Sequence, residues 1–404
     1  MLNNEKKHLK RYTPWGTLLL LLSLALILQG CLGPGDNTSP NGKTITTNSN
    51  GNQVNIVQNL FKGKIYFTID HNLWVTDGEN NTRKLVSGGN IYDPSVSPNG
   101  KWIAVSIRNK NSSDIAYIPV GGGAKRNLLS GRGGFYNDGG FIKSSNHWFA
   151  QPTWSPDSTH ILFVSDIEKE DWYTATGINA PLLDLQVFSI PFNNSSAKPQ
   201  DVAYASFGDG GDRDPSYRPG HPTEIVYTHY AYDSATHTQQ VIQIFLEDAN
   251  AIANHPGVYH PGLPGYDPGI AITNPKDQNL QPAFSSDGNA IVYVRRESTS
   301  QMGLYIMPVP EGVTANPNNP KVEQHALAPY KKSSHILSGQ YVSQPVWSPD
   351  GKQIAYISYK NSEFDLWLAK VTFNAKTSTY SLRGNPVQLT TGGIDGNSRP
   401  FWTP

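Results

Sequence analysis

Aspartates recur along the chain inside one short phrase, and a carboxylate is a residue type that serves as a general acid, a general base or a metal ligand. Asp157, Asp287 and Asp350 stand in SPDS, SSDG and SPDG, and Asn99 takes the same place in SPNG. The phrase also has the composition of a tight turn, in which Pro presets φ, Asp accepts backbone hydrogen bonds and Gly supplies a left-handed residue. Because a turn tolerates Asn and a catalytic acid does not, we interpret these aspartates as turn residues.

Other residue types that do chemistry are sparse. His255 and His260 are five residues apart in a Pro/Gly-rich segment with no cysteine nearby, which is a weak zinc pattern. The acidic run Asp209–Asp214 (DGGDRD) lacks the ligand spacing of a recognised calcium loop. Nucleophile-elbow, phosphate-loop and HExxH motifs are absent from the sequence. We therefore predict no catalytic residue, no metal and no cofactor.

The turn phrase belongs to a longer repeat that begins with a proline. Aligned copies surround Pro94, Pro152, Pro215, Pro282, Pro345 and Pro400, at intervals of 58, 63, 67, 63 and 55 residues. Self-similarity at a nearly constant period indicates a repeat architecture.

Each repeat contains four segments that read as short strands. The first carries Pro-x-aromatic, the turn follows, and the next two are apolar on both faces, as in Ile354–Ile357. Strands buried on both faces belong inside a stack of sheets. A weaker fourth segment follows, which in the fifth unit is Glu323–Pro329. Six units of four strands predict an all-β, six-bladed β-propeller.

The two ends of the repeat region complement each other. Lys64–Ile69, Asn72–Thr76 and Thr82–Val86 form three strands with no leading Pro-x-aromatic segment. Arg399–Pro404 supplies that segment and nothing more. We expect the C-terminal strand to close the first blade, which removes free sheet edges.

The phrase P-x-W-S-P-D-G-x-x-I-A-[FY]-x-S, repeated with this closure, resembles the TolB-type repeat, a family related to WD repeats. The resemblance covers about residues 61–404 and implies a propeller fold. TolB carries an α/β domain ahead of its propeller, whereas we expect a tether at that place in this chain.

The first thirty residues read as an export signal. Basic residues from Lys6 to Arg11 precede the apolar run Thr17–Leu28, which is too short to span a bilayer and suits a signal peptide. Leu28-Gln29-Gly30-Cys31 then resembles the lipobox of bacterial lipoproteins. The resemblance implies cleavage after Gly30 and lipidation of Cys31, the chain's single cysteine. We expect an extracytoplasmic protein anchored to a bacterial membrane.

Residues 31–60 are rich in Gly, Asn, Ser and Thr without a sustained period, and we expect a lipid-anchored flexible tether with a reach of roughly 30 Å. The propeller then occupies residues 61–404. The formal net charge of the chain is zero, which argues against a nucleic-acid partner.

The residue just before each repeat proline changes identity from blade to blade, while the phrase around it does not. We expect this residue to be extended, because proline disfavours a helical predecessor, and to line one mouth of the central channel. Two readings stay open, a solvated rim and a ring that binds a ligand or ion. The six residues are Asp93, Gln151, Asp214, Gln281, Gln344 and Arg399.

Long loops on the same face carry aromatic residues, which are common at protein interfaces and in sugar stacking. The loops are Gly131–Trp148, Ile167–Pro181, His229–Thr238 and Lys331–Tyr341. The alternative is that these side chains pack locally under the loops. The candidate binding residues are Phe135, Tyr136, Trp148, Trp172, Tyr173, His229, Tyr230, Tyr232 and Tyr341.

We therefore expect a monomeric, non-enzymatic binding or scaffold module that recognises a cell-envelope protein, peptide or glycan through one propeller face. Two alternatives remain open. One is a propeller enzyme such as a polysaccharide lyase, for which His147, His229 and Arg399 are the candidate residues. The other is a component of a Tol-like envelope complex.

Overall fold

The computed structural model describes residues 42–47, 51–57, 60–78, 82–138, 141–168, 184–194, 196–205, 210–232, 238–255, 267–314 and 321–404. The chain divides into a unit Met1–Gly42 and a unit Lys43–Pro404. Cys31 and the expected signal peptide lie outside the described residues. Among the described helices, none has the length and apolar content needed to cross a membrane.

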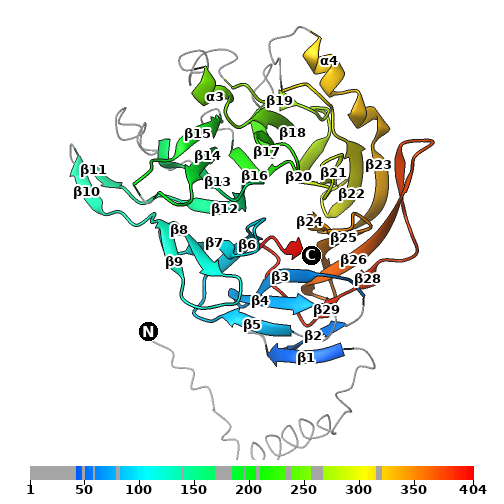
Figure 1. Ribbon diagram of the computed structural model, residues 1–404, viewed down its shortest axis with the longest axis horizontal. Coiled ribbons are helices and arrows are strands. Elements are labelled where there is room, and N and C mark those ends of the chain that lie inside the picture. Colours follow the sequence, from blue (N-terminus) through cyan, green and yellow to red (C-terminus); the bar gives the residue numbers. More distant parts are fainter. Residues whose placement is uncertain are drawn as a thin grey trace, which may run out of the picture. The chain divides into compact units, whose positions relative to one another are not determined.

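The second unit is a ring of six antiparallel blades, as predicted (Figure 1). Blade one contains β30 (Phe401–Thr403), β3 (Lys64–Ile69), β4 (Asn72–Asp77) and β5 (Thr82–Val86). Blade two contains β6 (Ile91–Val96), β7 (Trp102–Arg108), β8 (Ser113–Pro119) and β9 (Arg126–Leu129). Blade three contains β12 (Phe149–Trp154), β13 (His160–Ser165), β14 (Gln186–Pro191) and β15 (Gln200–Ala203).

The second half of the ring follows the same order. Blade four contains β16 (Gly211–Tyr217), β17 (Glu224–Tyr232), β18 (Gln240–Asp248) and β19 (Ile270–Ala271). Blade five contains β20 (Gln278–Phe284), β21 (Ala290–Arg296), β22 (Gln301–Pro308) and β23 (Ser334–Gln340). Blade six contains β24 (Ser343–Trp347), β25 (Gln353–Lys360), β26 (Glu363–Asn374) and β28 (Val387–Gln388), and β27 (Thr379–Leu382) pairs with the far end of β26.

The predicted closure of the ring is confirmed. The C-terminal strand β30 pairs with β3 and places Trp402 opposite Ile65. The indole N–H of Trp402 donates a hydrogen bond to the carbonyl of Lys62 at 2.8 Å. The two ends of the propeller therefore share one blade.

The middle strands are buried on both faces, which is why both of their faces are apolar. Ala355 and Ile357 of β25 belong to the core between blades six and one. Ile354 and Tyr356, on the other face of the same strand, belong to the core between blades five and six. The propeller thus has a hydrophobic layer between successive blades.

The fourth strand of blade five differs from our expectation. Glu323–Pro329 is not a strand: α4 (Val322–Ala326) and η1 (Pro329–Lys332) occupy this segment. Its Glu, Gln and Ala residues favour a helix, and Ala326 is buried against the core of blades four and five. The blade's fourth strand is instead β23, inside the segment 331–341 that we expected to be a loop.

Residues 42–57, which we expected to belong to a flexible tether, contain two strands. β1 (Gly42–Thr47) and β2 (Gln53–Val57) form a three-stranded sheet with β29 (Thr390–Thr391). Val54 and Ile56 alternate with polar residues and are fully buried beside blade six. The alternating pattern therefore adds this segment to the propeller.

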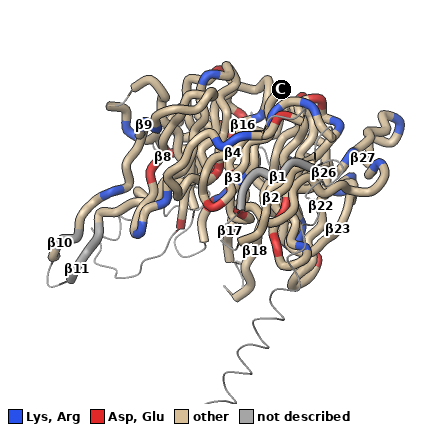
Figure 2. The backbone as a smooth tube through the Cα atoms, turned by 90° about the horizontal axis from the view of Figure 1, so that it is seen from below, with Lys and Arg blue, Asp and Glu red and all other residues tan. Residues whose placement is uncertain are grey.

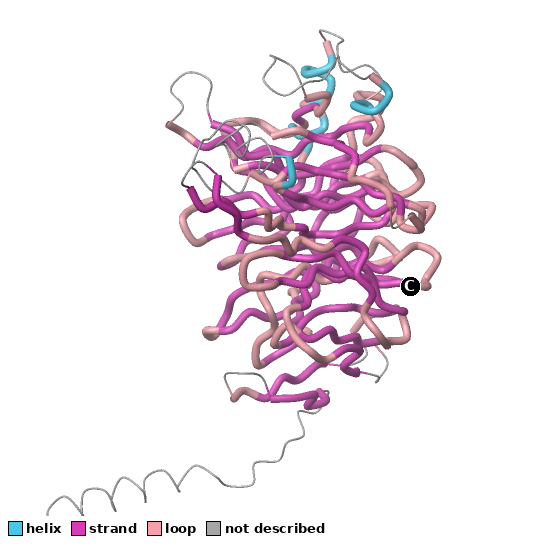
Figure 3. The backbone as a smooth tube through the Cα atoms, turned by 90° about the vertical axis from the view of Figure 1, so that its left-hand side faces the viewer, coloured by secondary structure: helices cyan, strands magenta, loops and turns pink. Residues whose placement is uncertain are grey.

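Several blades carry additions at their outer ends. β10 (Phe135–Asp138) and β11 (Phe141–Ser144) form a hairpin between blades two and three. In blade four, β17 continues to Tyr232, so the segment that we expected to be the loop 229–238 begins as strand. The short helices α3 (Ala251–Asn254) and α4 lie at the perimeter of blades four and five in Figure 1, and Figure 3 shows that strands predominate over helices.

The repeated aspartates are turn residues, as predicted. In blade six, Ser348 Oγ and the backbone N–H of Lys352 donate hydrogen bonds to Asp350 Oδ1 at 2.6 and 3.1 Å. Asp157 and Asp287 accept equivalent bonds in blades three and five. The hydrogen bond from Ser155 lowers the pKa of Asp157, as expected for an ionised turn acceptor.

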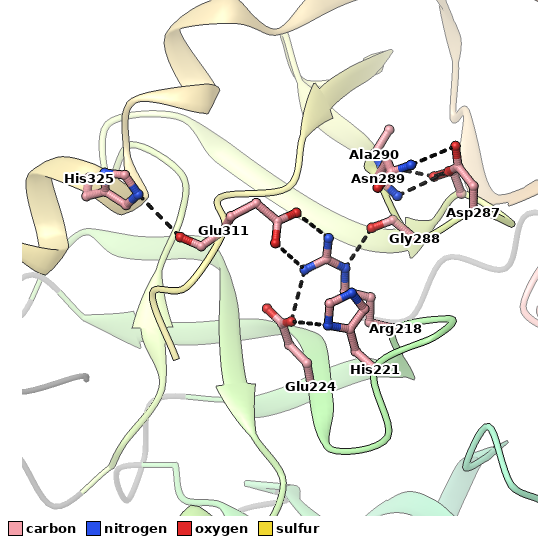
Figure 4. Close-up of polar contacts among 10 residues, drawn as sticks. Arg218, His221, Glu224, Asp287, Gly288, Asn289, Ala290, Glu311 and His325 are labelled. Carbon is pink, nitrogen blue, oxygen red and sulfur yellow. Dashed lines mark hydrogen bonds and ion pairs between the residues drawn. The ribbon is translucent and has the colours of Figure 1, made fainter. Parts of the chain in front are cut away.

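Blade four replaces the turn serine with Arg218, and the substitution joins blades four and five (Figure 4). The Arg218 side chain is fully buried, and its Nε donates to the carbonyl of Gly288 in the blade-five turn at 2.7 Å. Its Nη1 lies 3.0 Å from Glu224 Oε2, and the guanidinium also pairs with Glu311. The buried charge is thus matched by acceptors from both blades.

Candidate functional site

Five of the six residues that precede a repeat proline lie at a β-bulge. Asp93, Gln151, Asp214, Gln281 and Gln344 have φ between 50° and 57°, and the pairing register of each innermost strand shifts at this point. Our expectation of an extended backbone was wrong for these five residues. The extra residue of a bulge takes a left-handed conformation, and the requirements of the sheet outweigh the local preference set by proline.

The backbone N–H groups of all six residues donate to side chains of neighbouring blades. Five acceptors come from the preceding blade, and the sixth, Asp93, accepts from Arg399 across the closure of the ring. The bonds run from Asp93 to Ser398 (3.0 Å), Gln151 to Ser106 (3.1 Å), Asp214 to Gln151 (2.7 Å), Gln281 to Thr228 (2.9 Å), Gln344 to Gln281 (2.8 Å) and Arg399 to Asp93 (3.0 Å). These residues, which we call the channel ring, therefore link the blades to one another.

Two carboxyl groups and one guanidinium group give the channel ring its charge. Asp93 and Asp214 are buried, and burial raises the pKa of both while the nearby Arg399 opposes the rise. Arg399 Nη1 donates to the carbonyl of Pro215 at 3.4 Å. Since Arg399 lies in blade one and Pro215 in blade four, opposite each other in the ring, the Arg399 side chain crosses the central channel. Asp93 Oδ2 is buried without a hydrogen-bond partner in the described part of the chain.

Some of the predicted face residues pack locally instead of pointing to solvent. His229 Nδ1 lies 2.8 Å from Asp212 Oδ1, and the His229 ring contacts that of Phe245 at 4.6 Å between centroids. Trp148 packs against the core of blades three and four. Burial raises the pKa of Tyr230 to about 12. The contacts of His229 and Trp148 agree with the local-packing alternative, and Tyr230 is half-buried.

Tyr232 and Tyr341 are exposed, at 38% and 43% of their surface. Tyr341 precedes β24, the innermost strand of blade six. Tyr232 ends β17 and extends past Gly211, the first residue of the innermost strand β16 of blade four. Both tyrosines therefore lie at the end of the propeller where the innermost strands begin. The Tyr341 ring contacts Tyr359 edge-on at 5.8 Å, and Tyr359 contacts Phe364 at 4.8 Å. Trp172, Tyr173 and the side chains of Phe135 and Tyr136 lie outside the described residues.

The three lyase candidates each face a protein partner. His147 Nδ1 lies 3.8 Å from Asp166 Oδ1, His229 faces Asp212, and Arg399 bonds to Pro215. In the described part of the chain, no three His, Cys, Asp or Glu side chains are placed to hold a metal ion. Of the histidine pair considered for zinc, His260 lies outside the described residues.

A cluster of buried acids in blade four was missed by sequence reasoning. Tyr227 Oη donates to Glu247 Oε2 at 2.9 Å and to Asp267 Oδ1 at 3.4 Å. Burial, with a contribution from Asp212, raises the pKa of Asp267 to about 7, and burial raises the pKa of Glu247 well above its usual range. The sequence carried one signal for this cluster, because Glu247 lies within the mostly apolar strand segment VIQIFLED.

Charge does not single out one face of the molecule. Basic and acidic residues are interspersed over the view in Figure 2, in agreement with the zero net charge. This view shows no one-signed field that would steer a charged ligand.

Comparison with known proteins agrees with the fold. No family model matches the sequence, and no curated protein sequence matches it. Among solved structures, TolB from Acinetobacter baumannii is similar with a TM-score of 0.53, 15% identity, and coverage of 86% of this chain and 68% of that chain. A putative TolB from Agrobacterium tumefaciens has a TM-score of 0.46, with 14% identity over 85% of this chain and 98% of that chain.

A third similar structure is an oligogalacturonate lyase in complex with manganese, with a TM-score of 0.44, 12% identity, and coverage of 84% of this chain and 82% of that chain. The likeness to TolB, the six-bladed topology and the closure by β30 agree with one another. The chain is a six-bladed β-propeller with a TolB-like fold.

Proposed function

We propose that this protein is an extracytoplasmic binding or scaffold module that recognises a cell-envelope protein, peptide or glycan through the propeller face that carries Tyr232 and Tyr341. The observation that carries the proposal is the exposure of these aromatic side chains on the face where the innermost strands begin. Exposed aromatic residues beside a rigid scaffold are typical of recognition surfaces. The channel ring supports that scaffold by linking neighbouring blades.

Site-specific photo-cross-linking in cells that express the full chain tests the proposal. A photoreactive phenylalanine analogue replaces Tyr341, Tyr232 or, as the control, Phe373. Phe373 is 51% exposed, so it is as accessible as the two tyrosines. It lies at the opposite end of blade six, because it follows Lys370, which pairs with Gln353 at the start of β25. We expect adducts from Tyr341 and Tyr232 and none from Phe373. Equal labelling at all three positions, or none at the two tyrosines, would contradict the proposed face.

The identity of the adduct assigns the role. A peptidoglycan-associated protein as the cross-linked species would support a component of a Tol-like envelope complex, and a glycan would support a saccharide-binding module.

Anchoring through Cys31 is part of the same proposal, because more than one acyl chain gives stable membrane attachment. We expect the chain to incorporate an alkyne-tagged palmitate, and Cys31→Ser to abolish both the labelling and the membrane fraction. Labelling that persists in Cys31→Ser would overturn the anchor.

A further inference from the structure

A groove of about 340 Å³ lies between blades five and six. Its walls come from the end of β23 at Leu337–Gln340, from β25 at Tyr356–Lys360, and from Trp367 and Pro386. This volume lies within the range of small-molecule sites in proteins. Tyr341 and its neighbour Tyr359 stand at the same corner, so the groove opens beside the face described above.

Two hydrogen-bond donors in the groove have no acceptor in the described part of the chain. The indole N–H of Trp367 is buried and unpaired. Tyr356 is 3% exposed, its hydroxyl group makes no hydrogen bond to the described residues, and burial alone raises its pKa. Tyr356 and Trp367 are register partners on β25 and β26, so their side chains share one face of the blade.

Unpaired buried donors are uncommon in folded proteins, because each one keeps the desolvation penalty that a hydrogen bond would offset. The indole N–H of Trp367 is such a buried donor, and Trp367 and Tyr356 both line the groove. An acceptor-bearing ligand in the groove would satisfy them together.

The rim of the groove adds one positive charge and several neutral polar groups. Lys360 Nζ lies 5.0 Å from the centroid of the Trp367 ring. Gln340 and Asn361 contribute side-chain amides, and Ser358 contributes a hydroxyl group that donates to the Gln340 carbonyl at 3.2 Å. The lining residues include no Asp or Glu. The groove therefore complements a ligand with several acceptors and a negative charge.

We propose that this groove binds one saccharide unit that carries a carboxylate, with its ring oxygens accepting from Trp367 and Tyr356 and its carboxylate paired with Lys360. The donors come from side chains around a single small space, which fits one sugar ring, whereas an extended peptide would need a longer row of backbone groups. Aromatic walls and side-chain amides are the usual partners of a sugar ring. The inference rests on the proposed function in taking the adjoining face as the recognition surface.

The test uses the full chain in detergent with methyl β-D-glucuronide and the uncharged methyl β-D-glucoside as probes. Calorimetry gives the affinity, and the indole N–H resonance of Trp367, identified by its absence in Trp367→Phe, reports directly on hydrogen bonding. We expect the glucuronide to bind more tightly and to move this resonance downfield. We expect Lys360→Met to make the two glycosides bind equally.

Removal of either donor has an expected size. Because one hydrogen bond contributes about 0.5–1.5 kcal/mol, Trp367→Phe and Tyr356→Phe should each weaken glucuronide binding roughly three- to tenfold. Trp347→Phe is the matched control, because the Trp347 indole N–H is also buried and unpaired but Trp347 does not line the groove. We expect unchanged affinity in this control.

Three outcomes would overturn the proposal: no heat and no shift with either glycoside, equal losses in Trp367→Phe and Trp347→Phe, or tighter binding of the dipeptide Gly-Gly than of the glucuronide. The cross-linking experiment fails or succeeds independently. Loss of the Tyr341 and Tyr232 adducts with a persistent Trp367 shift would reject the proposed function and keep the groove, and the reverse result would reject the groove alone.

Discussion

Blade five meets its two neighbours in different ways. On the side of blade four, the buried Arg218 finds acceptors on Gly288, Glu224 and Glu311, and α4 packs over the perimeter of the same core. On the side of blade six, the buried indole N–H of Trp367 has no partner in the described part of the chain, and Trp367 and Tyr356 line a groove. Both interfaces are built from the same repeat. Both interfaces have an apolar core, and they differ in the polar groups beside it, which are mostly paired around Arg218 and include an unpaired indole N–H at Trp367.

The largest expected effect on stability is at the interface between blades four and five. Arg218→Met keeps the length of the side chain but leaves the carboxylate of Glu224 buried without its partner. We expect the free energy of unfolding to fall by about 3–5 kcal/mol, measured by chemical denaturation. Glu311→Gln is the control, because Glu311 is 64% exposed and an exposed partner contributes about 0–1 kcal/mol. A loss of less than about 1 kcal/mol in Arg218→Met would remove the contrast between the two interfaces.

The two sides of blade five should also respond to pH in opposite directions. In blade six, burial raises the pKa of Asp365 from 3.8 to about 6. The folded state then holds a proton that the unfolded state has lost, so stability falls as the pH rises from about 4 to about 6. On the other side, the hydrogen bond from Arg218 lowers the pKa of Glu311, and its stabilising effect is lost as the pH falls through that lowered value.

Denaturation at a series of pH values measures both effects. The wild-type free energy of unfolding should fall by about 1–3 kcal/mol between pH 4 and 7 because of Asp365, and Asp365→Asn should remove this fall. Glu311→Gln should change the free energy of unfolding only at acidic pH. The half-buried Asp201 and Asp267, whose pKa values are raised to about 6 and about 7, add to the loss of stability at rising pH in all of these variants. An unchanged slope in Asp365→Asn would show that Asp365 is not the group that titrates.

The smallest expected effect on stability is at the interface between blades five and six. Tyr356→Phe removes only a hydroxyl group that makes no hydrogen bond to the described residues, so we expect the free energy of unfolding to change by less than about 0.5 kcal/mol. Trp367→Phe removes an unpaired donor together with part of a ring that packs on the core, so we expect a loss of about 1 kcal/mol. The same denaturation series measures this change. A loss above about 1.5 kcal/mol would indicate that these donors are bonded within the protein, and the groove would then be another closed interface.

The fold was largely predictable because the information repeats. The turn phrase recurs at a nearly constant period, and Arg399–Pro404 matches the strand that the first blade lacks. The predicted turn role of Asp350 follows from local chemistry, and its hydrogen bonds agree with it.

The departures from prediction have tertiary causes. Proline favours an extended predecessor, yet Gln344 is left-handed because the bulge and the acceptor Gln281 on the preceding blade fix its backbone. Glu323–Pro329 carries helix-favouring Glu, Gln and Ala residues, but its place in the order of the repeat led to the strand prediction. QVNIV alternates as a strand should, but its Asn- and Ser-rich surroundings hid the pattern.

The groove could not be predicted from the sequence. Tyr356 and Trp367 stand in apolar strands where aromatic residues normally fill the core. Whether an indole N–H meets an acceptor depends on how two blades approach each other, and one repeat alone does not contain that information.

The pairing of β2 with β29 has a mechanical consequence. A pull on the N-terminal end of the chain reaches β2 before it reaches β3 of blade one, because Ile56 pairs with Thr390 and the N–H of Val57 donates to the carbonyl of Leu389. The antiparallel pair would unzip one bond at a time, at lower force than simultaneous shear of a whole strand. The segment 42–57 would then lengthen under load while the closed ring stays intact, because β2 would detach before any blade of the propeller opens.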